Sequence, residues 1–398
     1  MSEFSDIQNA DARYIANTYA RYPLLVSSGA GAVATDETGE RYIDFSSGIG
    51  VNSLGFCNAR WSKAVKEQLD TLTHASNLFY TRPQIKLAKQ LCQRVGMERV
   101  FFCNSGAEAN ECAIKTARKY SAQTYGDGRN VIVTLENSFH GRTLATLAAT
   151  GQAALREHFG PFPDGFIYAR VNDIEDLKAK TSSGVVCAVM IECIQGEGGV
   201  TVLNQDFVKT AAKLCAQNDI LLIIDEVQTG LGRTGKFSSF EWYGVKPDIV
   251  TMAKGLGGGL PIGAALFNEK TKNTLQASDH GSTFGGNPVV CAGAYEILRV
   301  IDENFLSDVT SKGDYMVKRL KNINGVKNAD GKGLMIGVEL ENGVSPANVV
   351  KSALKRGLML LTAKHKTRML PPLTITLEEI DEGLAIFKQT LDEEGETR

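Results

Sequence analysis

The sequence lacks the features that would indicate a metal-binding, secreted or membrane protein. Its eight cysteines form no C-x-x-C pair and several lie in apolar stretches, which indicates buried thiols in a reducing compartment. The five histidines show no ligand spacing, so no metal site is expected. No apolar run approaches the ~18 residues of a membrane span. The N-terminal residues show neither a signal peptide nor a typical transit peptide, and we therefore expect a cytoplasmic protein.

An excess of charge of either sign is also missing, since the formal net charge is −2 at pH 7. Nucleic-acid binding usually needs a basic surface, so that class of function is disfavoured. The apolar content of 43% and the charged content of 22% are those of an ordinary globular protein. A chain of 398 residues is long enough for two or three domains.

Apolar runs and helical periodicities alternate through the middle of the chain. The expected strands are 100–103, 131–135, 185–191, 220–224 and 249–252, and helices are expected at 107–120 and 206–216. Apolar runs without polar alternation indicate strands buried on both faces, as in a mostly parallel sheet flanked by helices. The sequence therefore predicts the α/β class.

The remaining elements indicate how the domains are divided. Helices are expected from Trp61, from Pro83 to about Val95, from about Pro288, and after a capping-box pattern at Thr376. Strands are expected around Val33 and at 42–45, 334–340 and 358–361. We predict an N-terminal segment, 1–60, that packs with a small C-terminal α/β domain, 288–398, and a large domain, 61–287.

Two of the predicted strands end in opposite charges, because 220–224 runs into Asp225 and Glu226, and 249–252 leads to Lys254. Ligands of open parallel sheets bind at the carboxyl ends of the strands. Pyridoxal 5'-phosphate would use both charges: a lysine would hold its aldehyde covalently, and an aspartate would keep its ring nitrogen protonated. On these residues alone, a salt bridge between two strand ends is an equal alternative.

Three further loops follow predicted strands or precede helices. Residues 104–108 form either an anion site at a helix start or a plain N-cap made by Ser105 and Glu108. Residues 137–142 offer an aromatic ring for stacking and Arg142 as a carboxylate clamp, or a loop with a surface arginine. Residues 192–199 place two acids in a glycine-rich bend, or form an ordinary turn.

A glycine-rich stretch, GLGRTG (230–235), superficially matches nucleotide-binding motifs. A P-loop needs Ser or Thr after its lysine to hold Mg²⁺, and Phe237 stands there. A Rossmann turn opens a long helix, but Gly244 and Pro247 follow too soon. Both nucleotide-binding readings are therefore disfavoured.

With these residues assembled, the chain resembles the class III (fold type I) pyridoxal-phosphate aminotransferases. The stretches that carry the resemblance are NSGAEAN (104–110), SFHGRT (138–143), ECIQGEGG (192–199), DEVQTGLGRTGK (225–236), AKGLGGGLPIG (253–263), GSTFGGNP (281–288) and RMLPPL (368–373). They span nearly the whole chain in family order. GIGVNSLG (48–55) and SNLFYT (76–81) favour the branch that acts on N-acetylornithine.

The resemblance implies a role for each matching residue. Lys254 would hold the cofactor and move the proton, and Asp225 would pair with the ring nitrogen. Arg142 and Ser282 would contact the amino donor. Arg368 would bind an α-carboxylate, and it would pair with Glu197 during the half-reaction with the amino donor. The remaining cofactor-binding residues would be Ser105, Gly106 and Ala107 at the phosphate, Phe139 and Val227 on the two ring faces, His140, Glu226 and Gln228 beside them, and Thr283 from the neighbouring subunit of a homodimer.

The implied reaction is transfer of the terminal amine of N2-acetyl-L-ornithine to 2-oxoglutarate, giving N-acetylglutamate 5-semialdehyde and glutamate, a step of arginine biosynthesis. Alternatives that keep the fold are ornithine, succinylornithine, succinyldiaminopimelate or 4-aminobutyrate as amino donor, or an aminomutase. A catalytically silent pyridoxal-phosphate-binding protein is disfavoured because Lys254 and Asp225 are both present. The sequence assigns neither a second role in lysine biosynthesis nor a function for the basic run Lys364, His365 and Lys366.

Overall fold

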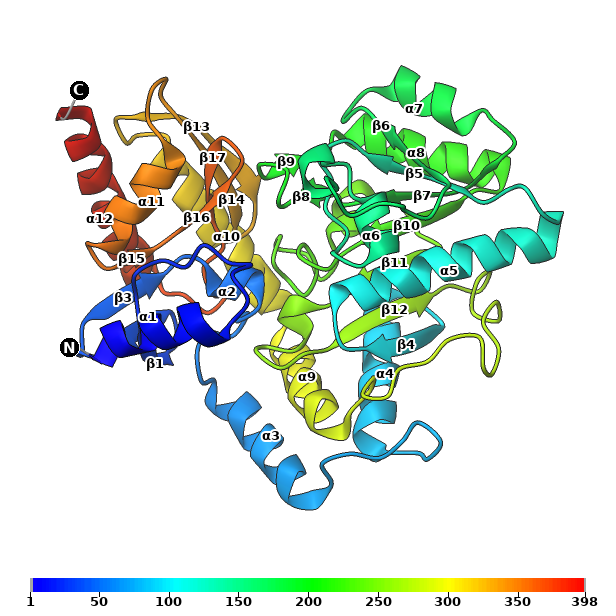
Figure 1. Cartoon of the computed structure of the whole chain (residues 1–398), viewed down its shortest axis with the longest axis horizontal. Helices are drawn as coiled ribbons and strands as arrows, with labels where there is room; N and C mark the ends of the chain where they lie inside the picture. The colour runs from blue at the N-terminus through cyan, green and yellow to red at the C-terminus, as the bar shows by residue number, and fades with distance from the viewer. Residues whose placement is uncertain (1–2, 397–398) are drawn as a thin grey trace.

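The computed structural model describes residues 3–396 and contains a large and a smaller group of elements (Figure 1). The large group surrounds a seven-stranded sheet in the order β4-β12-β11-β10-β7-β5-β6. Its strands are β4 (Arg99–Cys103), β5 (Val131–Leu135), β6 (Phe166–Ala169), β7 (Val186–Ile191), β10 (Leu221–Asp225), β11 (Ile249–Met252) and β12 (Gly263–Phe267). The mostly parallel sheet that the sequence predicts is confirmed, with β12 antiparallel to both of its neighbours.

Both faces of this sheet are buried, as the uninterrupted apolar runs predict. Along β10, Leu221 and Ile223 pack with Ala113 of α5 (Gly106–Tyr125) on one face. The intervening Leu222 and Ile224 belong to the core on the other face. The helices around the sheet are α3 (Ala59–Thr71), α4 (Arg82–Val95), α6 (Leu144–Ala149), α7 (Ile174–Thr181), α8 (Gln205–Asn218) and α9 (Pro288–Val300).

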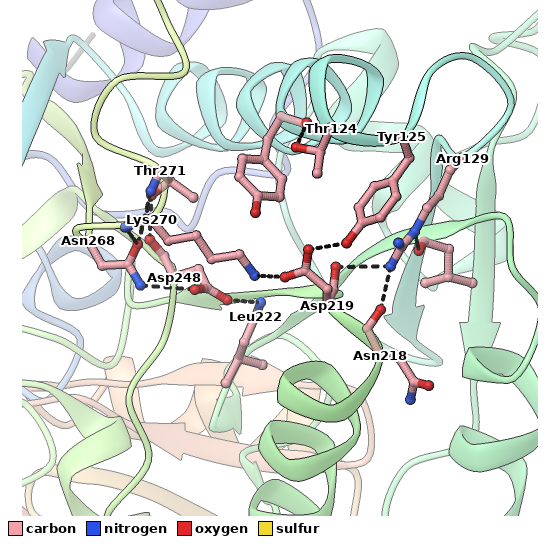
Figure 2. A network of polar contacts seen from close by, with 12 residues as sticks. Thr124, Tyr125, Arg129, Asn218, Asp219, Leu222, Asp248, Asn268, Lys270 and Thr271 are labelled. Atoms are coloured by element: carbon pink, nitrogen blue, oxygen red, sulfur yellow. Dashed lines mark hydrogen bonds and ion pairs between the residues drawn. The ribbon is translucent and has the colours of Figure 1, made fainter.

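A polar network fixes the amino ends of β10 and β11, away from the strand ends that carry Asp225 and Lys254 (Figure 2). The Asp219 carboxylate, just before β10, pairs with Lys270 and accepts a hydrogen bond from Tyr125 of α5. Asp248, just before β11, accepts a hydrogen bond from the Leu222 backbone at 2.9 Å. These bonds hold the two strands in register.

The smaller group joins the two ends of the chain. Strands β1 (Val26–Ala30), β2 (Val33–Asp36) and β3 (Arg41–Asp44) form one sheet with β15 (Leu358–Met359), which runs parallel to β3. A second sheet has the order β13-β14-β17-β16. Its strands and the adjoining helices are β13 (Val326–Lys332), β14 (Met335–Leu340), β16 (Leu361–Ala363), β17 (Lys366–Met369), α1 (Glu3–Tyr14), α2 (Ser47–Gly50), α10 (Glu303–Leu320), α11 (Pro346–Leu354) and α12 (Leu377–Glu396).

Several element boundaries differ from the sequence-based expectations. The single strand expected at 358–361 is two short strands, β15 and β16, which belong to different sheets. Strands β6 and β12 and helices α6, α7, α10 and α11 were not predicted. The capping box before α12 is confirmed, since Thr376 N–H donates to Glu379 Oε2 at 2.8 Å and Glu379 N–H donates to Thr376 Oγ1 at 3.1 Å.

Within residues 3–396, none of the helices is both long enough and apolar enough to cross a membrane. The same residues contain no group of three or more His, Cys, Asp or Glu side chains placed to hold a metal ion.

Candidate active site

A cavity of about 440 Å³ lies where the carboxyl ends of β4, β5, β7, β10 and β11 meet. It is the crevice in which ligands of open α/β sheets bind. Its lining brings together most of the predicted site residues: Ser105, Gly106, Ala107, Phe139, His140, Arg142, Glu197, Asp225, Val227, Gln228 and Lys254. The short strands β8 (Ile194–Gln195) and β9 (Thr201–Val202) flank the bend that carries Glu197.

Lys254 enters this cavity from a tight turn directly after β11. Its backbone has φ 44°, a left-handed conformation that costs a non-glycine residue on the order of 1 kcal/mol. The next residue must be small, because a Cβ on Gly255 would lie 2.4 Å from Ser53 Oγ. Desolvation lowers the pKa of the Lys254 ammonium, and the charge of Arg368 adds to this effect while that of Glu197 opposes it. A lowered pKa favours the neutral, nucleophilic amine.

Asp225 is held by three hydrogen bonds at the end of β10. Its Oδ2 accepts from Asn110 Nδ2 and from His140 Nδ1, both at 2.8 Å, and its Oδ1 accepts from Val227 N–H at 2.9 Å. Burial alone would lower the pKa of His140, but its hydrogen bond to Asp225 and the charges of Asp225 and Glu192 raise it. These donors fix the orientation of the carboxylate toward the cavity.

The start of α5 is capped by Ser105, as its sequence suggested, and it also borders the cavity. Ser105 Oγ caps the helix by accepting from Glu108 N–H at 3.1 Å. The Glu108 carboxylate bonds to Asn104 N–H at 2.6 Å instead of to Ser105 N–H, so the capping box closes one residue early. Ser105, Gly106 and Ala107 also line the cavity, where the free N–H groups of the first helical turn attract anions.

The bend after β7 positions the aromatic ring. Glu192 accepts a hydrogen bond from Phe139 N–H at 3.0 Å and another from Gly196 N–H at 3.3 Å. Burial raises the pKa of this carboxyl to about 7, and the negative charge of Asp225 adds to the rise. Phe139 and Val227 both reach the cavity, as expected for the two faces of a flat ring.

The two predicted carboxylate-binding arginines differ in their partners. Arg142 is exposed and its guanidinium lies 5.4 Å from the centre of the Phe139 ring. Arg368 is buried and donates to Glu197 at 2.6 and 3.3 Å. Gln228 bridges this pair, because its Oε1 accepts from Arg368 at 3.3 Å and its Nε2 donates to Glu197 at 3.4 Å. Burial would raise the pKa of Glu197, but the Arg368 charge and hydrogen bond lower it.

Four predicted site residues do not line this cavity: Arg368, which bonds to the lining residues Glu197 and Gln228, and Glu226, Ser282 and Thr283. Glu226 is fully buried and accepts hydrogen bonds from Thr229, Ser239 and the Phe240 backbone, so its side chain lies outside the cavity lining. Successive side chains of an extended segment point to opposite sides, and Asp225 takes the cavity side. Ser282 and Thr283 line a separate pocket within the chain, where Ser282 Oγ accepts from Asn104 Nδ2 at 3.0 Å.

Two cavity residues were missed by the sequence reasoning or left without a role. Asn110 is a polar residue among the buried, mostly apolar residues at the start of α5, next to Ala109 and Ala113. Such a residue on an apolar face is a signal for a buried polar partner. Glu192 was recognised only as a strand end, and its bonds to Phe139 and Gly196 depend on the fold.

The basic run 364–366 has polar partners in both groups of elements. Lys364 contacts Asn137 Oδ1, whereas Lys366 lies 3.5 Å from Asp330 of β13.

Comparisons with known proteins agree with this geometry. Residues 14–391 match the family described as aminotransferase class-III. The acetylornithine aminotransferase of Haemophilus ducreyi is 52% identical over 387 residues, which cover 97% of this chain and 98% of that protein. The crystal structure of N-acetylornithine aminotransferase from Stenotrophomonas maltophilia has a TM-score of 0.85 at 34% identity and covers 98% of this chain and 100% of its own. The ornithine aminotransferase of Toxoplasma gondii has a TM-score of 0.95 at 31% identity, covering 100% and 97%.

The fold and the site thus define a pyridoxal-phosphate enzyme of fold type I. Within that class, the chain belongs to the class-III aminotransferases.

The residues of the cavity fit pyridoxal 5'-phosphate. A Cβ on Gly106 would lie 2.6 Å from Val227 Cγ1, so glycine lets the start of α5 pack closely against Val227 beside the cavity. Lys254 supplies the amine, Asp225 the carboxylate, and Phe139 and Val227 two apolar surfaces. Pyridoxal 5'-phosphate is the cofactor of this family.

Proposed function

We propose that this enzyme transfers the terminal amine of N2-acetyl-L-ornithine to 2-oxoglutarate, as expected for arginine biosynthesis. The relative from Haemophilus ducreyi, which is aligned over almost its full length, bears the name of that activity. The observation that carries the proposal is the ion pair between Arg368 and Glu197. Arg142 lines the same cavity and forms no ion pair with any of residues 3–396. This arrangement suits two substrates that present their carboxylates differently.

The bound cofactor supplies an electron sink for the substrate carbon that loses its proton. The Lys254 amine would take that proton at Nζ and pass it to the cofactor. Asp225 would keep a positive charge on the ring nitrogen, and its bonds to Asn110 and His140 keep the carboxylate aimed. Phe139 would cover one face of the ring and exclude water from it.

Arg142 would bind the carboxylate that lies far from the reacting carbon in both half-reactions. Acetylornithine reacts at its chain end, so its carboxylate needs no second arginine. Glu197 would mask Arg368 during this half-reaction. When 2-oxoglutarate enters, its α-carboxylate would replace Glu197 on Arg368, one carboxylate exchanged for another.

We also propose that the active unit is a homodimer, in which Thr283 and Ser282 complete the site of the partner. Within the chain, these two residues lie in a different pocket from Lys254. The loop before α4 and the loop before α9 are tied together by Asn77, which donates to the Ser282 and Gly285 carbonyls. The exposed apolar side chains there are Leu69, Leu72, Leu78, Phe79, Tyr80, Ile85 and Phe284. Apolar patches of this kind mark interfaces.

Two experiments test these proposals. Initial rates with 2-oxoglutarate and a panel of amines should be highest for acetylornithine; a higher kcat/KM for ornithine or 4-aminobutyrate would overturn the substrate assignment. For the shared site, inactive Lys254→Ala and Thr283→Ala chains would be mixed and reassociated. If Thr283 serves the partner, hybrid dimers contain one intact site and activity returns. Activity that stays lost would place Thr283 in its own chain's site or outside it.

A further inference from the structure

The GLGRTG loop, which resembled a nucleotide-binding motif, forms the joint between the two groups of elements. It leaves the Asp225 strand and packs against the chain just before β14. A Cβ on Gly333 would lie 2.5 Å from the Thr234 carbonyl carbon and 2.7 Å from Arg233 O. A Cβ on Gly232 would lie 3.2 Å from Leu306 of α10. The backbones therefore touch here, and glycines make that approach possible.

Arg233, at the centre of this loop, is only 2% exposed and binds backbone atoms of the smaller group. Its carbonyl accepts from Leu334 N–H at 3.0 Å. Its guanidinium Nη1 donates to Leu334 O at 3.0 Å and to Pro371 O at 2.5 Å. Arg233 thus holds both backbone polar groups of Leu334, one with its own carbonyl and one with its side chain, and the same side chain holds the carbonyl of Pro371, 37 positions further along the chain.

The two residues held by Arg233 lie next to β17, which carries Arg368, and next to its partner strand β14. Leu334 directly precedes β14, and Pro371 comes two residues after β17. Between them, β14 and β17 are antiparallel, and Gly337 lies opposite Arg368. The segment after Arg368 is tied further by Leu370, whose N–H donates to Phe45 O at 2.7 Å and whose carbonyl accepts from Ser47 Oγ at 2.5 Å.

A buried arginine is a costly way to join two apolar cores. The charge of Asp44, itself buried, opposes the effect of burial on Arg233, but Arg233 Nη2 and Asp44 Oδ2 both lack a hydrogen-bond partner. An apolar side chain would fill the same joint without that cost. An apolar side chain has no hydrogen-bond donors, however, and so it cannot hold two carbonyl groups as the planar guanidinium does.

We propose that Arg233 is a positioning residue for Arg368. It connects the loop that follows Asp225 to one end of the antiparallel β14–β17 pair, where Leu334 and Pro371 lie, and so sets the place of the Arg368 guanidinium relative to the cavity. The inference rests on the proposed function in one respect, since Arg368 is taken to bind the α-carboxylate of 2-oxoglutarate. Displacement of a binding group by ~1 Å can reduce a rate by ~100-fold.

The test compares Arg233→Lys and Arg233→Met with Thr310→Val. Thr310 Oγ1 donates to Gly235 O at 3.4 Å, so its loss weakens the same joint without touching Leu334 or Pro371. Single-turnover spectra would give the rate constant and apparent Kd of each half-reaction, and thermal unfolding would report stability. The amino donor is whichever amine the wild-type protein uses best, so a wrong substrate assignment does not affect the comparison.

For Arg233→Lys we expect kcat/KM for 2-oxoglutarate to fall roughly tenfold or more, because lysine keeps the charge but not the planar donor group. The amino-donor half-reaction should change less than about threefold. The difference in loss between the two half-reactions should be larger for Arg233→Met. It should be smaller but in the same direction for Ser47→Ala, and absent for Thr310→Val. Equal losses in both half-reactions, or no loss in either, would overturn the proposal. So would an Arg233→Lys variant that fails to fold while Thr310→Val folds, because Arg233 would then serve stability alone.

Discussion

The Glu197 carboxylate lies 2.6 Å from the Arg368 guanidinium, although the two residues are 171 positions apart in the sequence. They come from different groups of elements, since Glu197 follows β7 and Arg368 lies in β17. Gln228 is hydrogen-bonded to both side chains and bridges the pair. The ion pair neutralises an arginine that would otherwise attract the wrong end of a terminal-amine substrate.

Replacing Glu197 by Ala should therefore have opposite effects on the two classes of amine. The unmasked Arg368 should slow the acetylornithine half-reaction by roughly 10-fold or more, the worth of one charge-assisted contact. The half-reaction with glutamate should be unchanged or faster. Single-turnover spectra with each amine measure this, and equal damage to both half-reactions would rule out masking by Glu197.

The two arginines should be separable by the same measurement. Arg368→Ala should cripple the 2-oxoglutarate half-reaction and largely spare the acetylornithine half-reaction. Arg142→Ala should weaken both by about 10- to 100-fold, because its carboxylate contact is common to the two substrates. Matched effects of the two variants would contradict their distinct roles.

Lys254→Ala should bind the cofactor without a covalent bond and should lose transamination. The purified wild-type protein should be yellow, and borohydride reduction followed by peptide mass spectrometry should place the cofactor on Lys254. Modification of another lysine would show that the assignment is wrong.

Asp225→Ala should leave the ring nitrogen unpaired and raise the barrier to proton removal. Loss of a charge-assisted bond is worth about 1.5–3 kcal/mol, so we expect turnover to fall at least 10- to 100-fold. Asn110→Ala removes only one of the three donors to that carboxylate and should cost less. Near-normal turnover by Asp225→Ala would exclude this residue from the chemistry.

Glu226 makes a prediction about stability that is independent of the cofactor site. Burial raises the pKa of its carboxyl from 4.5 to about 7, so the folded state keeps a proton that the unfolded chain releases. The contribution of Glu226 to stability is therefore greatest below pH 4.5 and is lost as the pH rises through about 7. Relative to Glu226→Gln, the wild-type unfolding free energy should decline by on the order of 1–3 kcal/mol across that range. The free energy of unfolding of both proteins would be measured by urea denaturation across this pH range. Profiles that run parallel for the two proteins would refute the prediction.

The sequence by itself determined the features that depend on neighbouring residues. Uninterrupted apolar runs specify strands buried on two faces, and the residue that follows such a strand lies at its carboxyl end. Asp225 and Lys254 could be identified in this way, as could the cap at Ser105 and the capping box at Thr376. The family motifs added the cofactor and the class of reaction. The division into domains and the subunit that uses Thr283 stay predictions.

Only the tertiary structure decided which distant groups meet. Glu226 is adjacent to Asp225 but points away from the cavity, where Ser239 and Phe240 satisfy it. Asn110 reaches Asp225 across 115 positions of sequence. Arg233 sits in a loop whose sequence suggests nucleotide binding, yet its partners are carbonyls just outside two strands, more than 100 positions away. A hydrogen bond or ion pair requires a partner within about 3 Å, and for these residues the packing of the two cores supplies that partner.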